Sequence, residues 1–203
     1  TFDSDDLMVA DKQFVKRFDE PSLRYQLKSF IPIADAQESK TIYTLLKRGS
    51  MEAMQDFFIR FWSDRNQLRP FEAWYAYTEK VKTVNSKFTT NLLYGFETDR
   101  GRVYLQYGSP NQILQATRQA GSNPYEIWHY YDQTGRQSNV RFVFLNRDLI
   151  GNNYELIHST ALGELKNEQW KTLVQSKGFG NPVETGSNTR DFFGNQLNDF
   201  FDQ

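Results

Sequence analysis

Residues 95–110 read GFETDRGRVYLQYGSP, which places four charges within six residues and then alternates polar with apolar side chains as far as Gly108. The segment 98–101, TDRG, has the composition of a tight turn, because short polar side chains cap backbone amides and glycine accepts positive φ. Val103 and Leu105 would then share one face of a strand with Tyr107. The stretch predicts a charged turn that enters the first strand of a sheet.

The charged side chains of this turn have two interpretations. In the first, they form an internal network that sets the register of the strand. In the second, they form a recognition loop that presents fixed charges to a partner. An exposed ion pair stabilises a protein by only about 0–1 kcal/mol, so exposed pairing alone does not explain the charge density. The candidate binding residues are Glu97, Thr98, Asp99, Arg100 and Arg102.

Helical periodicity precedes the turn, over residues 39–90. Apolar residues recur at the spacing of one helical face, Ser50 has the side chain of an N-cap, and a third helix is expected to begin at Pro70. Residues 1–38 mix charges with alternating apolar positions around Pro32. We expect them to form an extended segment, since proline is tolerated at sheet edges.

Strand periodicity follows the turn. Residues 125–131 (YEIWHYY), 140–145 (VRFVFL) and 154–158 (YELIH) are rich in β-branched and aromatic residues and are separated by turn signals. The intervals are too short for parallel crossovers, which favours an antiparallel meander. Helices followed by strands predict the α+β class, with N-terminal helices packed on a C-terminal antiparallel sheet of about four or five strands within residues 95–160.

The domain so defined covers residues 39–165, and residues 166–203 are predicted to add a short helix, a linker and a Phe-rich tail. The linker, at 178–188, is rich in Gly, Asn, Pro and Ser. The tail has an apolar helical pattern, so we expect it to dock on its own domain or on a partner. Its apolar residues are Phe192, Phe193, Leu197, Phe200 and Phe201.

Composition excludes several classes of protein. With 24 Lys and Arg against 25 Asp and Glu in 203 residues, the chain has no basic field for nucleic acid or for an anionic membrane surface. It contains no cysteine, which excludes disulfide scaffolds, zinc ribbons and thiol nucleophiles. No apolar run is long enough to form a transmembrane segment. The chain starts at Thr1, and we expect a processed piece from which any targeting segment has been removed.

Catalytic signatures are missing from the sequence: it has no G-x-S-x-G elbow, H-E-x-x-H pair, P-loop or dinucleotide fingerprint. Its two histidines, His129 and His158, fall in predicted strands, where a hydrogen-bonded, partly buried imidazole is the usual situation. We therefore assign no catalytic residue, no metal site and no cofactor. A hydrolase that uses Glu126, His129 or His158 is an alternative, and it requires these side chains to converge in one cleft.

The segment GFETDRG, residues 95–101, resembles the signature of the GWxTD-domain proteins, found in Bacteroidota and their relatives. Phe96 replaces the characteristic Trp; it keeps an aromatic anchor but lacks the indole N–H donor. The resemblance continues in separate motifs that occur in the expected order: FFIRFWSDRN (57–66), RVYLQYGSPN (102–111), YEIWHYY (125–131), RFVFLNRDL (141–149) and YELIHSTALGEL (154–165).

The resemblance implies an exported protein of the cell envelope, periplasmic or associated with the outer membrane, of which this chain is the C-terminal part. It supplies no catalytic residue. We therefore expect a non-enzymatic protein-interaction module that binds an envelope protein, with surface assembly or secretion as its setting.

A carbohydrate- or peptidoglycan-binding module is the alternative function. Aromatic residues make up 16% of the chain, and exposed aromatic rings on a sheet are suited to stacking against sugars. The candidate stacking residues are Tyr104, Trp128 and Tyr130.

Overall fold

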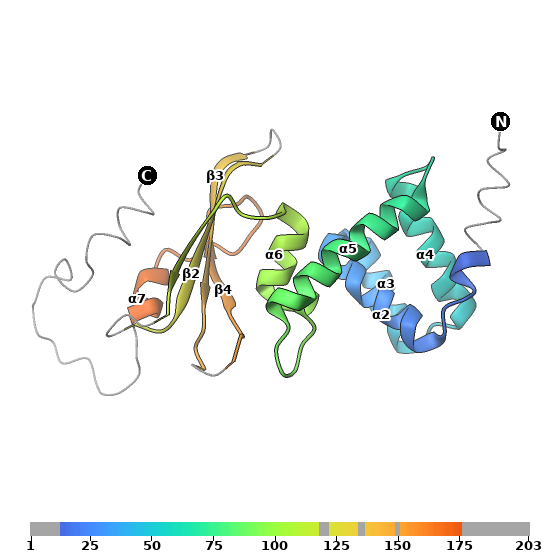
Figure 1. The fold of residues 1–203 in the computed structure, drawn as a ribbon, viewed down its shortest axis with the longest axis horizontal. Helices are drawn as coiled ribbons and strands as arrows, with labels where there is room; N and C mark the ends of the chain where they lie inside the picture. Colours follow the sequence, from blue (N-terminus) through green and yellow to red (C-terminus); the bar gives the residue numbers. More distant parts are fainter. Residues whose placement is uncertain (1–12, 118–121, 134–136, 149–150, 176–203) are drawn as a thin grey trace, which may run out of the picture.

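The computed structural model describes residues 13–117, 122–133, 137–148 and 151–175. Helices make up the N-terminal half and an antiparallel sheet the C-terminal half, with one short helix between them (Figure 1). The helices are α2 (Glu20–Phe30), α3 (Ala36–Arg48), α4 (Met51–Arg65), α5 (Pro70–Phe88), α6 (Asp99–Tyr107) and α7 (Trp170–Gln175), with 3-10 turns η1 (Ile31–Ile33) and η2 (Gly95–Glu97). The strands are β1 (Gln112–Ala116), β2 (Tyr125–Gln133), β3 (Gln137–Leu145) and β4 (Glu155–Ser159). The predicted α+β class is confirmed.

The three helices predicted within residues 39–90 are α3, α4 and α5. The Ser50 side chain accepts a hydrogen bond from Ala53 N at the start of α4, and Pro70 is the first residue of α5. α4 and α5 each bury a stripe of residues at helical spacing, and these stripes form an aromatic core to which α3 contributes Ile42. Its largest members are Phe57, Phe58, Phe61, Trp62, Trp74 and Tyr77.

The prediction of an extended segment before residue 39 is wrong where the structure describes it. Residues 20–30 form α2, whose N-cap Asp19 accepts a hydrogen bond from Ser22 N over 3.0 Å. Leu23, Leu27 and Phe30 are fully buried on one face, at the i, i+4, i+7 spacing of a helix. The alternation around Leu23 concealed this longer period.

The sheet is the predicted antiparallel meander, in the order β1–β2–β3–β4. Register in its centre pairs Ile127 with Val143 and Trp128 with Phe142. Residues 125–130 of β2 and 140–145 of β3 are buried on both faces, since one face packs against the helices and the other against α7 (Figure 1). This double burial explains the near-continuous apolar run of the two central strands.

The prediction of a strand over residues 102–107 is also wrong, since these residues lie in α6. Thr98 caps the start of this helix, and Gly108, with a φ of 83°, ends it. α6 lies between α5 and η1 on one side and the sheet on the other, so it is buried on more than one face. The first strand is instead β1, a mostly exposed edge strand.

The short helix predicted near residue 170 is confirmed as α7, with Trp170 and Val174 buried against the sheet. The predicted linker and Phe-rich tail lie outside the described residues. None of the helices in the described part of the chain is both long enough and apolar enough to cross a membrane.

Candidate functional site

The signature segment forms a compact corner made of η2, Thr98 and the first turn of α6. The Thr98 hydroxyl donates to Gly95 O over 2.7 Å and accepts from Gly101 N over 3.1 Å. The Glu97 carboxylate accepts from Tyr94 N over 3.0 Å, which closes the turn from the other side. These bonds satisfy the backbone amides that the start of a helix leaves without intrahelical partners.

Both glycines of the signature are required by close packing. A Cβ atom on Gly101 would lie 1.8 Å from Gly95 O, and one on Gly95 would lie 2.3 Å from Val84 O in α5. Since real Cβ atoms do not approach backbone oxygen so closely, only glycine lets α5, η2 and α6 meet at this distance.

Arg100 is buried and joins α6 to the sheet. Its Nη1 donates to Glu126 Oε1 on β2 over 3.0 Å, and its Nη2 donates to Asn152 O over 2.7 Å. The guanidinium carbon lies 4.2 Å from the centre of the Tyr154 ring. Glu126 also accepts from the Trp128 indole N–H over 2.9 Å. A buried charge is costly unless it has such a set of partners. The Arg100–Glu126 ion pair therefore has a structural role, which is to connect α6 to β2.

The remaining charges of the signature are joined to β4 and the segment that follows it. Asp99 Oδ2 accepts from Leu156 N on β4 over 2.7 Å. Arg102 forms a two-pronged ion pair with Glu164, at 2.7 and 2.8 Å. All five predicted binding residues of the turn therefore make contacts within the chain, as the internal-network interpretation requires.

The three predicted stacking residues lie in different surroundings. Trp128 and Tyr130 are each 1% exposed and belong to the core between α6 and the sheet, where neither ring is open to a sugar. Tyr104 is half-buried and borders a cavity at the C-terminal end of α6.

The residues proposed for a hydrolase do not converge. Glu126 faces α6, whereas His158 faces α7, where its ring stacks on Trp170 and its Nδ1 accepts from Asn167 N over 3.1 Å. His129 contacts Asn139. Burial lowers the pKa of both histidines. Across the residues that the structure describes, no three His, Cys, Asp or Glu side chains are grouped to hold a metal ion.

A groove of about 390 Å³ opens beside the signature corner, between η1, α3 and the start of α6. Its walls expose more apolar than polar surface, and Tyr43, which lines it, is 60% exposed. Lys28 adds a positive charge. The lining residues are Lys28, Ile31, Pro32, Tyr43, Leu46, Phe96, Glu97, Thr98, Asp99 and Arg102.

A second, more open hollow of about 620 Å³ runs along the surface of α3, and Tyr43 lines both this hollow and the groove. It is lined by Lys40, Lys47 and Arg48. With Lys28, these exposed cations make no ion pair with any residue in the described ranges. We call this surface, made of Lys28, Lys40, Tyr43, Lys47 and Arg48, the α3 face.

The α3 face was missed from the sequence, although a signal for it exists. Lys40, Tyr43 and Lys47 follow one another at i, i+3 and i+7, which places them on the same side of a helix. The buried Ile42 marks the opposite, core side. A polar face of a helix is usually exposed to solvent without binding anything. The two hollows beside α3 distinguish this face from an ordinary one, and a sequence does not show them.

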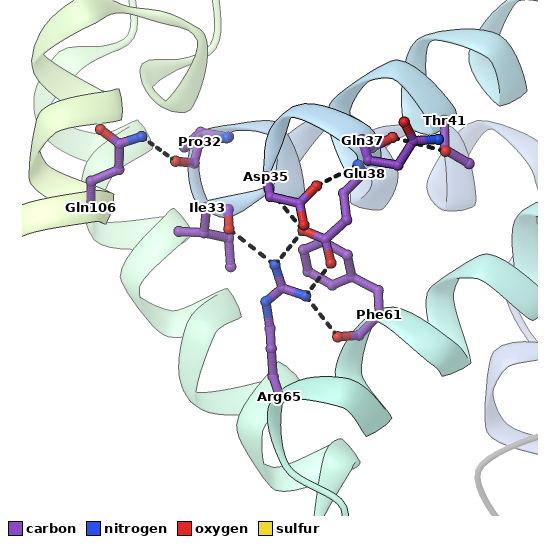
Figure 2. Close-up of polar contacts among 9 residues, drawn as sticks. All are labelled: Pro32, Ile33, Asp35, Gln37, Glu38, Thr41, Phe61, Arg65 and Gln106. Atoms are coloured by element: carbon purple, nitrogen blue, oxygen red, sulfur yellow. Dashed lines mark hydrogen bonds and ion pairs between the residues drawn. The ribbon is translucent and has the colours of Figure 1, made fainter. Parts of the chain in front are cut away.

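The turn η1, which supplies Ile31 and Pro32 to the groove, is held by polar contacts that Figure 2 shows together. Arg65, from the last turn of α4, donates to Ile33 O over 3.0 Å and to both carboxylate oxygens of Glu38, at 2.7 and 2.8 Å. Gln106 of α6 donates to Pro32 O over 2.6 Å. The Arg65 bond lowers the pKa of Glu38. These bonds fix η1, and with it one wall of the groove, to α4 and α6.

The family profile of the GWxTD domain matches residues 4–176 of the chain. No curated protein and no solved structure matches the chain.

Proposed function

The chain belongs to the GWxTD domain family, and we propose that it is a non-enzymatic protein-interaction module of the bacterial cell envelope, with surface assembly or secretion as its setting. The proposed contact surface is the α3 face with the adjoining groove. The proposed occupant is a segment of a partner protein that carries apolar and acidic side chains.

The observation that carries this proposal is the unpaired charge of the α3 face. Over the whole chain acids and bases balance, with a formal net charge of −1, yet four cations gather here around an exposed tyrosine. Tyrosine and arginine are enriched at protein interfaces, and complementary charge speeds association and selects partners. An acidic and apolar segment matches both the cations and the apolar groove.

The signature residues are less suited to direct contact than the α3 face. Arg100 is buried, and the carboxylates of Glu97 and Asp99 already accept backbone amides. Their part in the proposed function is to position the wall of the groove, to which Glu97 and Asp99 contribute.

The proposed location in the periplasm or at the outer membrane is supported by what family membership implies. Fractionation of the source organism, with an antibody against this chain, tests it. Recovery with the soluble cytoplasmic proteins would contradict the proposal.

The contact surface is tested by affinity capture from a solubilised envelope extract, followed by mass spectrometry. The unmodified chain is compared with Lys40→Glu/Lys47→Glu, which reverses two charges of the α3 face. Lys16→Glu/Arg17→Glu is the matched control, because it changes the net charge equally at two exposed positions that line neither hollow.

We expect a protein that the unmodified chain and the control retain and that the α3 variant loses. Its capture should weaken as salt is raised, because exposed charges are screened within about 8–10 Å at physiological ionic strength. Equal retention by all three proteins would contradict the proposal. Binding to anionic lipid vesicles without any retained protein would replace the protein partner with a membrane surface.

A further inference from the structure

A separate cavity of about 510 Å³ lies at the opposite end of α6 from the signature corner. It is bounded by α5, the C-terminal turn of α6, the loop before β1, and β2. Its volume falls within the range typical of small-molecule sites. The lining residues are Lys80, Tyr104, Leu105, Gln106, Tyr107, Gly108, Ser109, Asn111, Tyr130 and Asp132.

Some polar groups of this cavity are used by the fold. The Tyr130 hydroxyl donates to Gly108 O over 3.0 Å, and the Tyr107 hydroxyl donates to Glu164 over 3.2 Å. The amide of Gln106 bonds to both Arg102 and Pro32. These hydrogen bonds fix the walls of the cavity. The two tyrosine hydroxyls and the Gln106 amide already have partners within the chain.

Four other side chains on the same cavity remain available. Lys80, Tyr104, Ser109 and Asp132 form no side-chain hydrogen bond or ion pair with any other residue in the described ranges. They come from α5, α6, the following loop and β2, so four separate elements direct polar residues to one cavity. By contrast, the polar residues of the signature that line the groove are all bonded within the chain.

From this convergence we propose that the cavity is a binding site for a neutral carbohydrate. A sugar hydroxyl both donates and accepts hydrogen bonds, so one ligand satisfies the ammonium of Lys80, the carboxylate of Asp132 and the hydroxyls of Tyr104 and Ser109. A purely anionic or cationic ligand would meet one like charge in the same space. Charges of both signs that do not pair with each other therefore favour a neutral, polyhydroxylated ligand.

Tyr104 also supplies apolar surface. Its ring is half-buried, packs on the core side against Phe88 and Trp128, and lies 5.2 Å from Lys87 Nζ. The half-buried Tyr107 borders the same cavity, whereas the ring of Tyr130 is buried beneath it. Aromatic rings offer apolar area to the C–H groups of a sugar while the polar groups bind its hydroxyls. The site goes beyond the proposed protein contact and shares no residue with the α3 face.

Saturation-transfer NMR tests the proposal on the full chain, with maltose, cellobiose and N,N′-diacetylchitobiose as probes at about 1 mM, where weak sites are still occupied. We expect transfer to at least one of them. Asp132→Ala should weaken binding of that saccharide about tenfold, since hydrogen bonds to charged groups are the stronger ones. Ser109→Ala should weaken it several-fold.

Asp64→Ala is the matched control, because Asp64 is an exposed acid that does not line the cavity. It should bind the saccharide as the unmodified chain does. Absence of transfer to all three saccharides would overturn the proposal, and so would binding that Asp132→Ala and Ser109→Ala both leave unchanged. Transfer to the zwitterion glycylglycine alone would assign the cavity to a peptide. None of these outcomes bears on the α3 face, which different variants test.

Discussion

Arg100 donates to Glu126 over 3.0 Å, and both side chains are almost completely buried, at 4% and 6% exposed. This ion pair joins the first turn of α6 to the start of β2, and so connects the helical half of the molecule to the sheet. The most strongly charged part of the signature is thus an internal joint. The α3 face, by contrast, carries exposed cations that form no ion pair with any other residue that the structure describes.

Removing the arginine should be costly. Arg100→Ala leaves Glu126 buried without its cation, which typically destabilises a protein by about 3–5 kcal/mol. Chemical denaturation measures the loss. The control is Arg147→Ala, which breaks an ion pair with Glu155 whose side chains are both about half exposed and should cost less than about 1 kcal/mol. Similar losses in the two variants would contradict the structural role of the Arg100 pair.

Close packing at the signature corner predicts that Gly101→Ala is severe. Its Cβ would lie 1.8 Å from a backbone oxygen, so α6 would have to move, at a cost of at least about 3 kcal/mol. Gly163→Ala is the comparison: Gly163 has a φ of 82° and open space around it, so only backbone strain of about 1–2 kcal/mol is expected. If thermal unfolding shows the reverse order, the contact of η2 with α6 is not tight.

The buried His158 predicts a loss of stability in mild acid. Burial lowers its pKa, so the unfolded chain binds a proton first as the pH falls below about 6.5. The contribution of His158 to the free energy of unfolding should be fully present above that pH. It should decrease as the pH falls toward the lower pKa of the folded state. His158→Gln should reduce this slope in denaturation series between about pH 7.5 and pH 5. His129 keeps part of it, because burial lowers its pKa as well. An unchanged slope would contradict the prediction.

At lower pH, Glu38 should dominate. The bond from Arg65 lowers the pKa of Glu38, so its contribution is present above the unfolded value near 4.5 and lost as the pH falls through the folded value. Glu38→Gln should cost about 1–2 kcal/mol and speed hydrogen exchange around η1. Glu72→Gln, which breaks an exposed pair with Arg69, should change neither quantity measurably.

The sequence predicted much of this architecture. The helices of residues 39–90 have a clear period, because each presents one face to the core, and three of the four strands are marked by β-branched and aromatic runs between turn signals. α6 was predicted as a strand because a short helix buried on more than one side lacks a single apolar stripe, and Val103, Leu105 and Tyr107 happen to alternate. β1 was missed because an exposed edge strand carries little apolar signal.

The candidate site was less predictable. The sequence identified the charged signature residues but not their partners, since Glu126 and Glu164 lie 26 and 62 residues away from the arginines that they bind. Nor does a sequence show which surface is concave. The groove beside the α3 face and the proposed carbohydrate cavity are each formed by residues of several separate elements, so they appear only once the chain is folded.

The most direct test of the account compares Arg100→Lys with Tyr43→Ser, measuring both the unfolding free energy and the affinity for the captured partner. The single ammonium of Arg100→Lys cannot replace the two guanidinium nitrogens that bind Glu126 and Asn152, so stability should fall while the affinity of the folded protein is kept. Tyr43→Ser removes an exposed side chain, so stability should hold while affinity falls about tenfold or more. If Arg100→Lys instead abolishes binding at unchanged stability, and Tyr43→Ser binds normally, the signature is itself the contact surface.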